Sequence, residues 1–423
     1  MQPVTPRGFR DVLFAEAAER ESVAARVSAA LGAWGYEPIE TPVAEDFRTL
    51  EAGVGGEVDH LAFRLIDLDG TLLALRPEMT VPIARVAASR LADVPGPHRI
   101  RYTADVFREH ASLRGQSRQF TQIGVELIGA RGPAADAEVV LALIDALEAT
   151  GLESFQIGLG TIEVLVSLLA ESGGEPEWRD AVIAAAQERN FVELDRLAAR
   201  DDLTSELARA LVELPRSRGG REALDACTAL AAACGCEESM CSLRETYRIL
   251  EVAGYAERVV LDFGIVRSLR FYTGLQIEAY APGLGLPLAG GGRYDRLLAA
   301  FGTPSPAAGF ALGLERVMIA LAEQGRTPRV APLDAVLGGP DVPAAFVAAA
   351  RLRAAGWRVR VAPGRTGAAV LLQAEETGAA EALLAEGERI VRLDRAGEPA
   401  GDLGDPVPEP PRLTWAARGG EDR

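Results

Sequence analysis

The chain has 423 residues, of which 48% are hydrophobic, and this predicts one to three domains with an ample core. Its formal net charge of -17 argues against a broad nucleic-acid-binding surface. All 44 basic residues are arginines, which excludes mechanisms that need a lysine Schiff base or a phosphate-loop lysine. The N-terminus carries no signal-peptide pattern, and no apolar run is long enough to span a membrane, so we expect a cytoplasmic protein.

The first part of the chain predicts a helix, an edge strand and a hairpin. Apolar residues recur at helical spacing over residues 16–34, and Gly35 ends this helix. Residues 36–43 are predicted to form a strand whose two prolines restrict it to an edge or an interface. A helix leading into such a strand is typical of a dimer element and equally of an ordinary packing unit. Residues 63–76 hold two apolar runs joined by Asp69 and Gly70, a strong signal of a hairpin turn.

Glu78 stands at a predicted junction between a strand and a helix. Residues 80–91 have a helical pattern, in which Pro82 is acceptable because it lies in the first turn. The carboxylate of Glu78 therefore has two interpretations. It points into a cleft that the sheet edge lines, or it merely complements the positive end of the helix dipole.

Residues 99–129 predict the hairpin around which the rest of the chain is organised. Its second strand alternates, so that one face is apolar and the other carries Gln122, Gly124 and Glu126. The glycine leaves room for a ligand, and a carboxylate on an inner face is costly unless a cation such as a ligand ammonium meets it. A surface hairpin with its polar residues turned outward explains the pattern equally well. Three arginines lie in or beside the polar loop between the strands: Arg108, Arg114 and Arg118.

The middle of the chain is predicted to be mostly helical. A helix over residues 134–150 and a strand near 155–159 precede a long alanine- and leucine-rich part, residues 162–256, which we interpret as a helical insertion between strands of the main sheet. The insertion carries all four cysteines, whose spacing lacks the paired CxxC form of many zinc sites. Reduced thiols are therefore favoured over a metal site. The four are Cys227, Cys234, Cys236 and Cys241.

The sheet is predicted to resume after the insertion. Residues 259–283 hold two strands with Arg267 between them, and the glycines 290–292 allow close approach of the backbone to a ligand or another strand. A strand over residues 309–313 then leads into a helix. Arg316 lies in the first turn of that helix, where a cation opposes the dipole, so it faces an anion or forms a surface salt bridge.

The end of the chain predicts a small α/β domain over residues 334–405, reached through a linker at 326–334 and followed by a tail at 406–423 that frays. The domain ends in an acidic stretch and lacks an obvious basic surface for RNA phosphates. Its predicted elements are, in order, a strand at 334–337, a helix at 343–355, strands at 357–362 and 369–373, a helix at 378–384 and a strand at 388–393.

An ordered set of motifs now carries a resemblance. Along residues 6–321 the chain contains RPE-x-T before a helix, the FR-loop-RQF-x-Q-x-G-x-E hairpin, R-x-L-x-F-Y-T-G, GGRYD and GFALGLER. Together they resemble the catalytic core of histidyl-tRNA synthetases, which belong to class II. The resemblance implies an α+β fold, with a class II antiparallel sheet flanked by helices, formed by residues 1–325. The C-terminal domain is similar only in outline to an anticodon-binding domain, in a degenerate form.

Several stretches resemble a second family of that superfamily more closely, the ATP phosphoribosyltransferase regulatory subunits. They are LALRPEMTVPIARVAASRL, FTQIGVELIGA, the insertion sequence that begins AAQERNFVELDRLAARDD, and FYTGLQIEAYAPGLGLPLAGGGRYD. The resemblance implies a non-catalytic subunit, without a cofactor, that the short-form catalytic subunit needs for activity and for histidine feedback. The reaction of that catalytic subunit is the first step of L-histidine biosynthesis. The alternatives are an active histidyl-tRNA synthetase and a stand-alone amino-acid sensor or protein modifier.

The resemblance also implies partners and a site. The partners are the short-form catalytic subunit in a hetero-octamer, a second copy in a dimer, and L-histidine; neither tRNA nor a membrane is expected. Two carboxylates and an amide suit an ammonium and an imidazole ring. The implied histidine-binding residues are Glu78, Thr80, Gln122, Glu126, Arg267 and Tyr272, and the implied anion-binding residues are Arg108 and Arg316. No metal ligand is implied.

The departures from the synthetase pattern fall on the nucleotide side. His110 stands in place of a glutamate, Ala111 and Gln116 stand in place of arginines, and Ser268 and Arg270 replace a glycine and an aspartate. Gln116 would deprive an ATP phosphate of a charge-assisted hydrogen bond, which is about twice as strong as a neutral one. We therefore expect histidine binding to survive while adenylation is lost.

Overall fold

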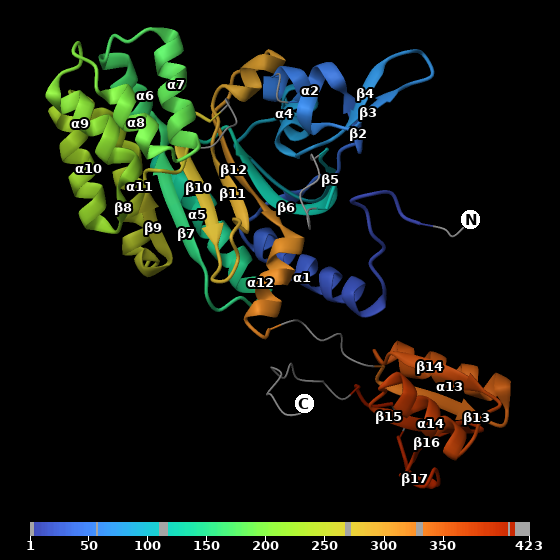
Figure 1. The fold of residues 1–423 in the computed structure, drawn as a ribbon. Helices are drawn as coiled ribbons and strands as arrows, with labels where there is room; N and C mark the ends of the chain where they lie inside the picture. Colours follow the sequence, from blue (N-terminus) through green and yellow to red (C-terminus); the bar gives the residue numbers. More distant parts are fainter. Residues whose placement is uncertain are drawn as a thin grey trace. The chain divides into compact units, whose positions relative to one another are not determined.

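The computed structural model describes residues 4–55, 58–109, 117–266, 272–326, 333–404 and 407–410. It divides into two compact units, Met1–Pro328 and Arg329–Arg423, each of which is described by itself (Figure 1). None of the helices in these ranges is both long enough and apolar enough to cross a membrane.

The first unit is built on a nine-stranded sheet. Its strands pair antiparallel except at β1–β5 and β7–β9, which are parallel. Helices flank the sheet, so the predicted α+β fold with an antiparallel core is confirmed. In spatial order the strands are β1 (Glu37–Pro38), β5 (His98–Phe107), β6 (Gln119–Ile128), β12 (Ala307–Gly313), β11 (Ala289–Arg293), β10 (Leu275–Tyr280), β7 (Gln156–Thr161), β9 (Val259–Asp262) and β8 (Arg218–Gly219).

The predicted hairpin is formed by β5 and β6, and both faces of β6 are covered. Ile123, Val125 and Leu127 are fully buried against α1 (Phe14–Ala33) and α5 (Gly132–Thr150). The opposite face is buried as well: Gln122 is 8% and Glu126 1% exposed, and α4 (Thr80–Ser89) packs on this face. The interpretation as a surface hairpin is therefore wrong.

A smaller three-stranded sheet lies beside α4 on the side of the molecule away from α1 (Figure 1). Its antiparallel strands are β2 (Ala44–Asp46), β4 (Leu72–Leu75) and β3 (Arg64–Ile66), and the turn between the last two contains Asp69 and Gly70 as predicted. A second apolar cluster joins α4 to α2 (Phe47–Val54), α3 (Val58–Leu61) and the short helix η5 (Leu297–Phe301).

The strand predicted over residues 36–43 is much shorter in the structure. Only Glu37 and Pro38 pair with β5, and the next strand begins at Ala44 in the other sheet. Proline lacks a backbone N–H, and two prolines in eight residues leave too few donors for a continuous ladder.

Helices fill the chain between β7 and β9, at the left of Figure 1. Their buried side chains belong to the same apolar cluster as α1 and α5, so this part packs directly on the main sheet. The two-residue strand β8 occurs among the helices and adds an edge to that sheet. The helices are α6 (Ile162–Glu171), α7 (Pro176–Gln187), α8 (Phe191–Ala198), α9 (Ser205–Glu213), α10 (Arg221–Ala233) and α11 (Cys241–Val252). After β12 the unit closes with α12 (Leu314–Glu323), as predicted.

The second unit is a five-stranded sheet with two helices. In spatial order its strands are β14 (Val359–Pro363), β13 (Ala335–Gly339), β15 (Glu381–Glu386), β16 (Arg389–Leu393) and β17 (Pro399–Asp402), and the helices are α13 (Val342–Ala354) and α14 (Ala368–Thr377). The strand predicted at 369–373 is α14, the helix predicted at 378–384 is mostly β15, and β17 was not predicted. β15 lies in the middle of the sheet, so its side chains are buried on both faces and show no alternation.

Candidate functional site

The site lies where the N-terminus of α4 meets the buried polar face of β6. Glu78 caps the helix, because its two carboxylate oxygens accept hydrogen bonds from the backbone N–H groups of Thr80, at 2.6 Å, and Val81, at 3.0 Å. Its side chain is only 8% exposed. Burial raises the pKa of Glu78, and these two hydrogen bonds and the Arg108 charge oppose that rise. The hydrogen bonds of Glu78 are therefore those of an acid that caps the helix, and the same carboxylate lies inside the candidate site.

Glu126 is the most deeply buried acid of the site, with 1% of its surface exposed. One carboxylate oxygen accepts from the Thr80 hydroxyl at 2.9 Å, and the other accepts from the Tyr294 hydroxyl. Both donors are neutral. Burial raises the pKa of Glu126 to about 8, and the nearby Glu78 adds to the rise. At neutral pH this carboxyl is therefore mostly protonated, and a bound cation would ionise it.

Glycines on the neighbouring strands make room for these side chains. A Cβ at Gly309, which lies opposite Glu126, would stand 2.0 Å from a carboxylate oxygen of Glu126. A Cβ at Gly124 would stand 2.5 Å from the hydroxyl of Tyr102. The space beside Gly124 is thus filled by Tyr102, which corrects the prediction that this glycine leaves room for a ligand.

Two further predicted residues lie on the same face. The ring of Tyr272 lies 3.1 Å from the position of a Cβ at Gly292, and Tyr272 packs against the cluster that contains Tyr102 and Tyr294. Gln122 is 8% exposed, and its side-chain oxygen accepts no hydrogen bond within the described ranges. It lies four residues from Glu126 on one strand, about 13 Å along the chain. An unsatisfied buried acceptor costs stability, so it calls for a donor such as a ligand ammonium or N–H.

The predicted anion-binding arginines make contacts with protein groups. Arg108 donates from Nε to the carbonyl oxygen of Pro77 at 2.8 Å, and its guanidinium lies 5.2 Å from the ring centroid of Phe120. Arg316 donates to the carbonyl oxygen of Pro287 at 2.7 Å. It follows Gly313, which pairs with Gln122 across β12 and β6, so it belongs to the Gln122 end of the site.

The predictions on the nucleotide side fall largely outside the described residues. The departures from the synthetase pattern lie outside the described residues: His110, Ala111, Gln116, Ser268 and Arg270. The predicted histidine-binding residue Arg267 also lies outside them. The structure therefore brings together Glu78, Thr80 and Glu126, places Tyr272 and Gln122 on the same sheet face, and leaves Arg267 a prediction.

Tyr294 is the site residue that the sequence did not reveal. It is 3% exposed and donates to Glu126 from the position directly after β11, 168 residues further along the chain. A signal existed in the GGRYD motif, because Tyr294 lies two residues after Gly292 and thus on the same face of the chain. This motif contributed to the family resemblance, which implied no role for Tyr294.

The cysteines of the insertion are unpaired thiols. Cys227 and Cys236 are buried, and Cys241 is exposed. Within the ranges that the structure describes, no group of three or more His, Cys, Asp or Glu side chains is arranged to hold a metal ion.

The chain is similar to known proteins over most of its length. The protein-family model for histidyl-tRNA synthetase matches residues 8–317. The solved structure of an ATP phosphoribosyltransferase regulatory subunit/histidyl-tRNA synthetase from Bacillus halodurans superposes with a TM-score of 0.78 at 30% identity, over 89% of this chain and 97% of that one. A histidyl-tRNA synthetase from Nostoc has the same TM-score at 21% identity, which shows the shared fold alone. The first unit thus has the fold of class II histidyl-tRNA synthetases.

The curated relatives identify the family more narrowly. The ATP phosphoribosyltransferase regulatory subunit of Moorella thermoacetica is 37% identical over 93% of this chain and 98% of its own length. That of Symbiobacterium thermophilum is 40% identical over 85% of this chain and 92% of its own length. The chain belongs to the family of ATP phosphoribosyltransferase regulatory subunits, as its motifs predicted.

Proposed function

We propose that this chain is a non-catalytic regulatory subunit that assembles with a short-form ATP phosphoribosyltransferase catalytic subunit and transmits feedback by L-histidine. The assembly is the hetero-octamer of the family, in which this chain also contacts a second copy of itself. Membership of the family and 98% coverage of a named relative support this assignment. The catalytic subunit would depend on it for activity in the first step of L-histidine biosynthesis.

The observation that carries the histidine proposal is the charge deficit around Glu126. The carboxyl is buried, its two hydrogen-bond donors are neutral hydroxyls, and its pKa is raised to about 8. The imidazole or ammonium of histidine would supply the missing positive charge. Gln122, with its unsatisfied oxygen, would accept from a second N–H of the same ligand.

Loss of adenylation is supported by the sequence rather than by the site geometry. Gln116 stands where the synthetase pattern has an arginine, and an uncharged amide replaces a charge-assisted contact to an ATP phosphate. The site would thus keep the half that binds the amino acid and lack part of the half that binds the nucleotide.

Feedback requires that histidine binds two states of the complex with different affinity. A ligand shifts an equilibrium only by its differential affinity for the two states. If histidine also changes the affinity of the two chains for each other, reciprocity requires assembly to change histidine affinity by the same factor. Histidine affinity measured with and without the catalytic subunit is therefore a direct test of the coupling.

The first experiment is histidine-dependent ATP–pyrophosphate exchange with the purified chain alone. We expect no exchange in a sample that binds histidine by calorimetry. Robust exchange would overturn the non-catalytic assignment in favour of a histidyl-tRNA synthetase. In the same calorimetric assay, Glu126→Gln should weaken histidine binding, and Glu257→Gln, a change at an exposed acid, should leave it unchanged.

The second experiment is reconstitution with the short-form catalytic subunit. We expect phosphoribosyltransferase activity only when both chains are present, and inhibition by histidine that Glu126→Gln removes while basal activity remains. A catalytic subunit whose activity does not depend on this chain would contradict the proposal. Light scattering of the isolated chain should give the mass of a dimer.

A further inference from the structure

The N-terminal segment crosses the end of the hairpin formed by β5 and β6. The backbone N–H of Arg118, directly before β6, donates to the carbonyl oxygen of Gly8 at 2.8 Å, and the hydroxyl of Ser117 donates to the same oxygen at 3.3 Å. Gly8 has a φ of +79°, and a Cβ there would stand 2.5 Å from the Cγ and Cδ atoms of Arg118. Only glycine fits this contact without a shift of one of the two segments.

The side chain of Arg118 joins three parts of the first unit that are far apart in the sequence. Its guanidinium carbon lies 4.2 Å from the ring centroid of Phe63, which precedes β3, and 5.9 Å from that of Phe9 in the N-terminal segment. A terminal nitrogen donates to the carboxylate of Glu109 at 3.0 Å, and 22% of the side chain is exposed. A planar guanidinium can lie against aromatic rings and bond to a carboxylate at the same time, and an ammonium lacks that geometry.

Arg118 is linked to the candidate site through Arg108. The carbonyl oxygen of Arg118 accepts from the backbone N–H of Arg108 at 2.9 Å, so the two residues face each other at the end of the hairpin. Arg108 donates from Nε to the carbonyl oxygen of Pro77, the neighbour of Glu78, and its charge opposes the rise in the pKa of Glu78. A change at Arg118 therefore acts on the acid site through the position of Arg108.

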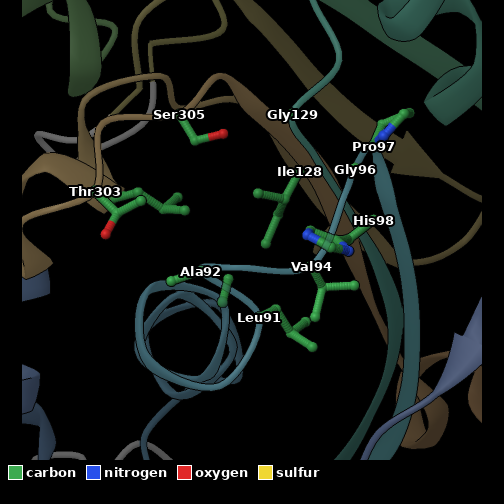
Figure 2. Close-up of a pocket in the computed structure, with 12 residues that line it drawn as sticks. Leu91, Ala92, Val94, Gly96, Pro97, His98, Ile128, Gly129, Thr303 and Ser305 are labelled. Carbon is green, nitrogen blue, oxygen red and sulfur yellow. The ribbon is translucent and has the colours of Figure 1, made fainter.

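The charges around the site indicate which part of a ligand these arginines meet. Glu78, Glu126 and the oxygen of Gln122 suit the ammonium and imidazole of histidine, and its carboxylate needs a cation. A pocket of about 340 Å³ lies at the other end of α4, beside the last residues of β6 (Figure 2). Within the described ranges no arginine lines that pocket, so it offers a carboxylate no guanidinium. This leaves the Gln122 end of the strand, where Arg108 and Arg316 lie, for the carboxylate.

We propose that Arg118 is a positioning residue, which with Phe9 and Phe63 fixes the end of the hairpin so that Arg108 meets the carboxylate of the bound ligand. The N-terminal segment thereby supports ligand recognition as well as packing. This inference rests on the proposed histidine binding and adds to it the recognition of one end of the ligand.

The test compares L-histidine with histamine, which has the same imidazole and ammonium groups and lacks the carboxylate. In calorimetry of the full-length chain, Arg108→Ala should weaken L-histidine binding about tenfold, because a hydrogen bond between charged groups is lost, and should leave histamine binding unchanged. Arg118→Ala should show the same selectivity with a loss of about three- to tenfold. An equal loss for both ligands is the result of damaged packing, and it would overturn the proposal, as would a loss for neither.

A double variant shows whether Arg118 acts through Arg108. If it does, Arg118→Ala causes no further loss once Arg108 is alanine, so the double variant and Arg108→Ala should bind L-histidine equally. Losses that add in the double variant would show two independent contributions, and the positioning role would then be wrong.

A glycine variant tests the same contact with every arginine in place. In Gly8→Ala the added Cβ meets the side chain of Arg118 and forces the two segments apart, so the selective loss of L-histidine affinity should recur. Gly235→Ala is the matched control, because Gly235 has a φ of +73° and no atom within 4 Å of its Cβ position. It carries a similar backbone strain and should leave both affinities unchanged. Normal L-histidine binding by Gly8→Ala would contradict the proposal.

Failure of the proposed function gives a different result. A wild type that binds neither L-histidine nor histamine overturns the histidine proposal and, with it, this one. A wild type that binds both ligands, and loses affinity for both in Glu126→Gln, retains the histidine site. In that case a variant Arg118→Ala that does not distinguish the two ligands overturns the positioning role alone.

Discussion

A carboxylate is buried against each face of the main sheet, and the two differ in the charge of their hydrogen-bond donors. On the face toward α5, Asp136 is 1% exposed and accepts a hydrogen bond from Nε of Arg293 at 2.8 Å. On the face toward α4, Glu126 is equally buried, but its donors are the hydroxyls of Thr80 and Tyr294. One acid has a guanidinium beside it, and the other has only neutral partners.

This difference separates an acid that supports the fold from one that is open to a ligand. Burial raises the pKa of Asp136, and the charge of Arg293 opposes that rise from within the fold. Arg293 also bonds to Asp295, which leads into the loop before β12. Burial raises the pKa of Glu126 to about 8, so a cation would gain from binding next to it. Two acids with the same exposure therefore predict opposite responses to mutation.

The largest expected effect is on stability and concerns Asp136. Asp136→Ala leaves the buried guanidinium of Arg293 without its main partner, and removal of one member of a buried pair costs about 3–5 kcal/mol. Denaturant unfolding should show this loss. Arg196→Ala is the matched control, because it breaks an exposed pair with Glu193 and should cost at most about 1 kcal/mol. A loss below 1 kcal/mol for Asp136→Ala would remove the distinction between the two acids.

The next effect is on ligand affinity and concerns Glu126. Hydrogen bonds to a charged group contribute about 1.5–3 kcal/mol, so Glu126→Gln should weaken histidine binding about 10- to 100-fold. The variant should be at least as stable as the wild type at pH 7, because folding forces a proton onto Glu126 that the unfolded chain releases, and the glutamine of the variant has no such cost. Calorimetry tests the predicted histidine affinity, and denaturant unfolding of the same preparation tests the predicted stability. A large loss of stability with normal histidine affinity would make Glu126 a structural acid.

The sheet was predictable where the pattern is local. Alternation over residues 99–129 predicts β5 and β6, and the Asp69-Gly70 turn predicts the hairpin of β3 and β4. Local pattern failed where tertiary burial covers both faces. The four central residues of β15, 382–385, are all buried, so a strand and a helix give the same apolar signal there, and the prediction of a strand for the neighbouring α14 is wrong.

The site, like the sheet, was predictable from local motifs and not from tertiary contacts. Family motifs selected Glu78, Thr80 and Glu126, and the structure places them in one hydrogen-bond network; their part in binding stays a prediction. No spacing in the sequence shows that Tyr102 fills the space beside Gly124, or that Tyr294 reaches Glu126. The first contact depends on the register of the hairpin and on the direction of the Tyr102 ring, and the second joins residues 168 positions apart, so only the folded sheet reveals them.

The pH dependence of stability sharpens the comparison. The pKa of Glu126 is raised from 4.5 to about 8, so the folded protein keeps a proton that the unfolded chain releases. The free energy of unfolding should therefore fall as the pH rises from about 4.5 to about 8, by at most about 1.4 kcal/mol per pH unit from this group. Glu126→Gln should remove that part of the slope. Unfolding curves of both proteins between pH 5 and 8 check it, and parallel slopes would contradict it.

The smallest expected effect isolates one of the two neutral donors. Tyr294→Phe removes the hydroxyl that bonds to Glu126 and keeps the buried ring, so the loss at pH 6 should be that of a neutral hydrogen bond, about 0.5–1.5 kcal/mol. The loss should grow above pH 8, because an ionised Glu126 gives up a charge-assisted bond in this variant. Histidine affinity should fall for the same reason, since the bound cation keeps Glu126 ionised. Unfolding measured at both pH values decides the matter: a loss that is independent of pH would mean that Tyr294 contributes packing and does not support the charge on Glu126.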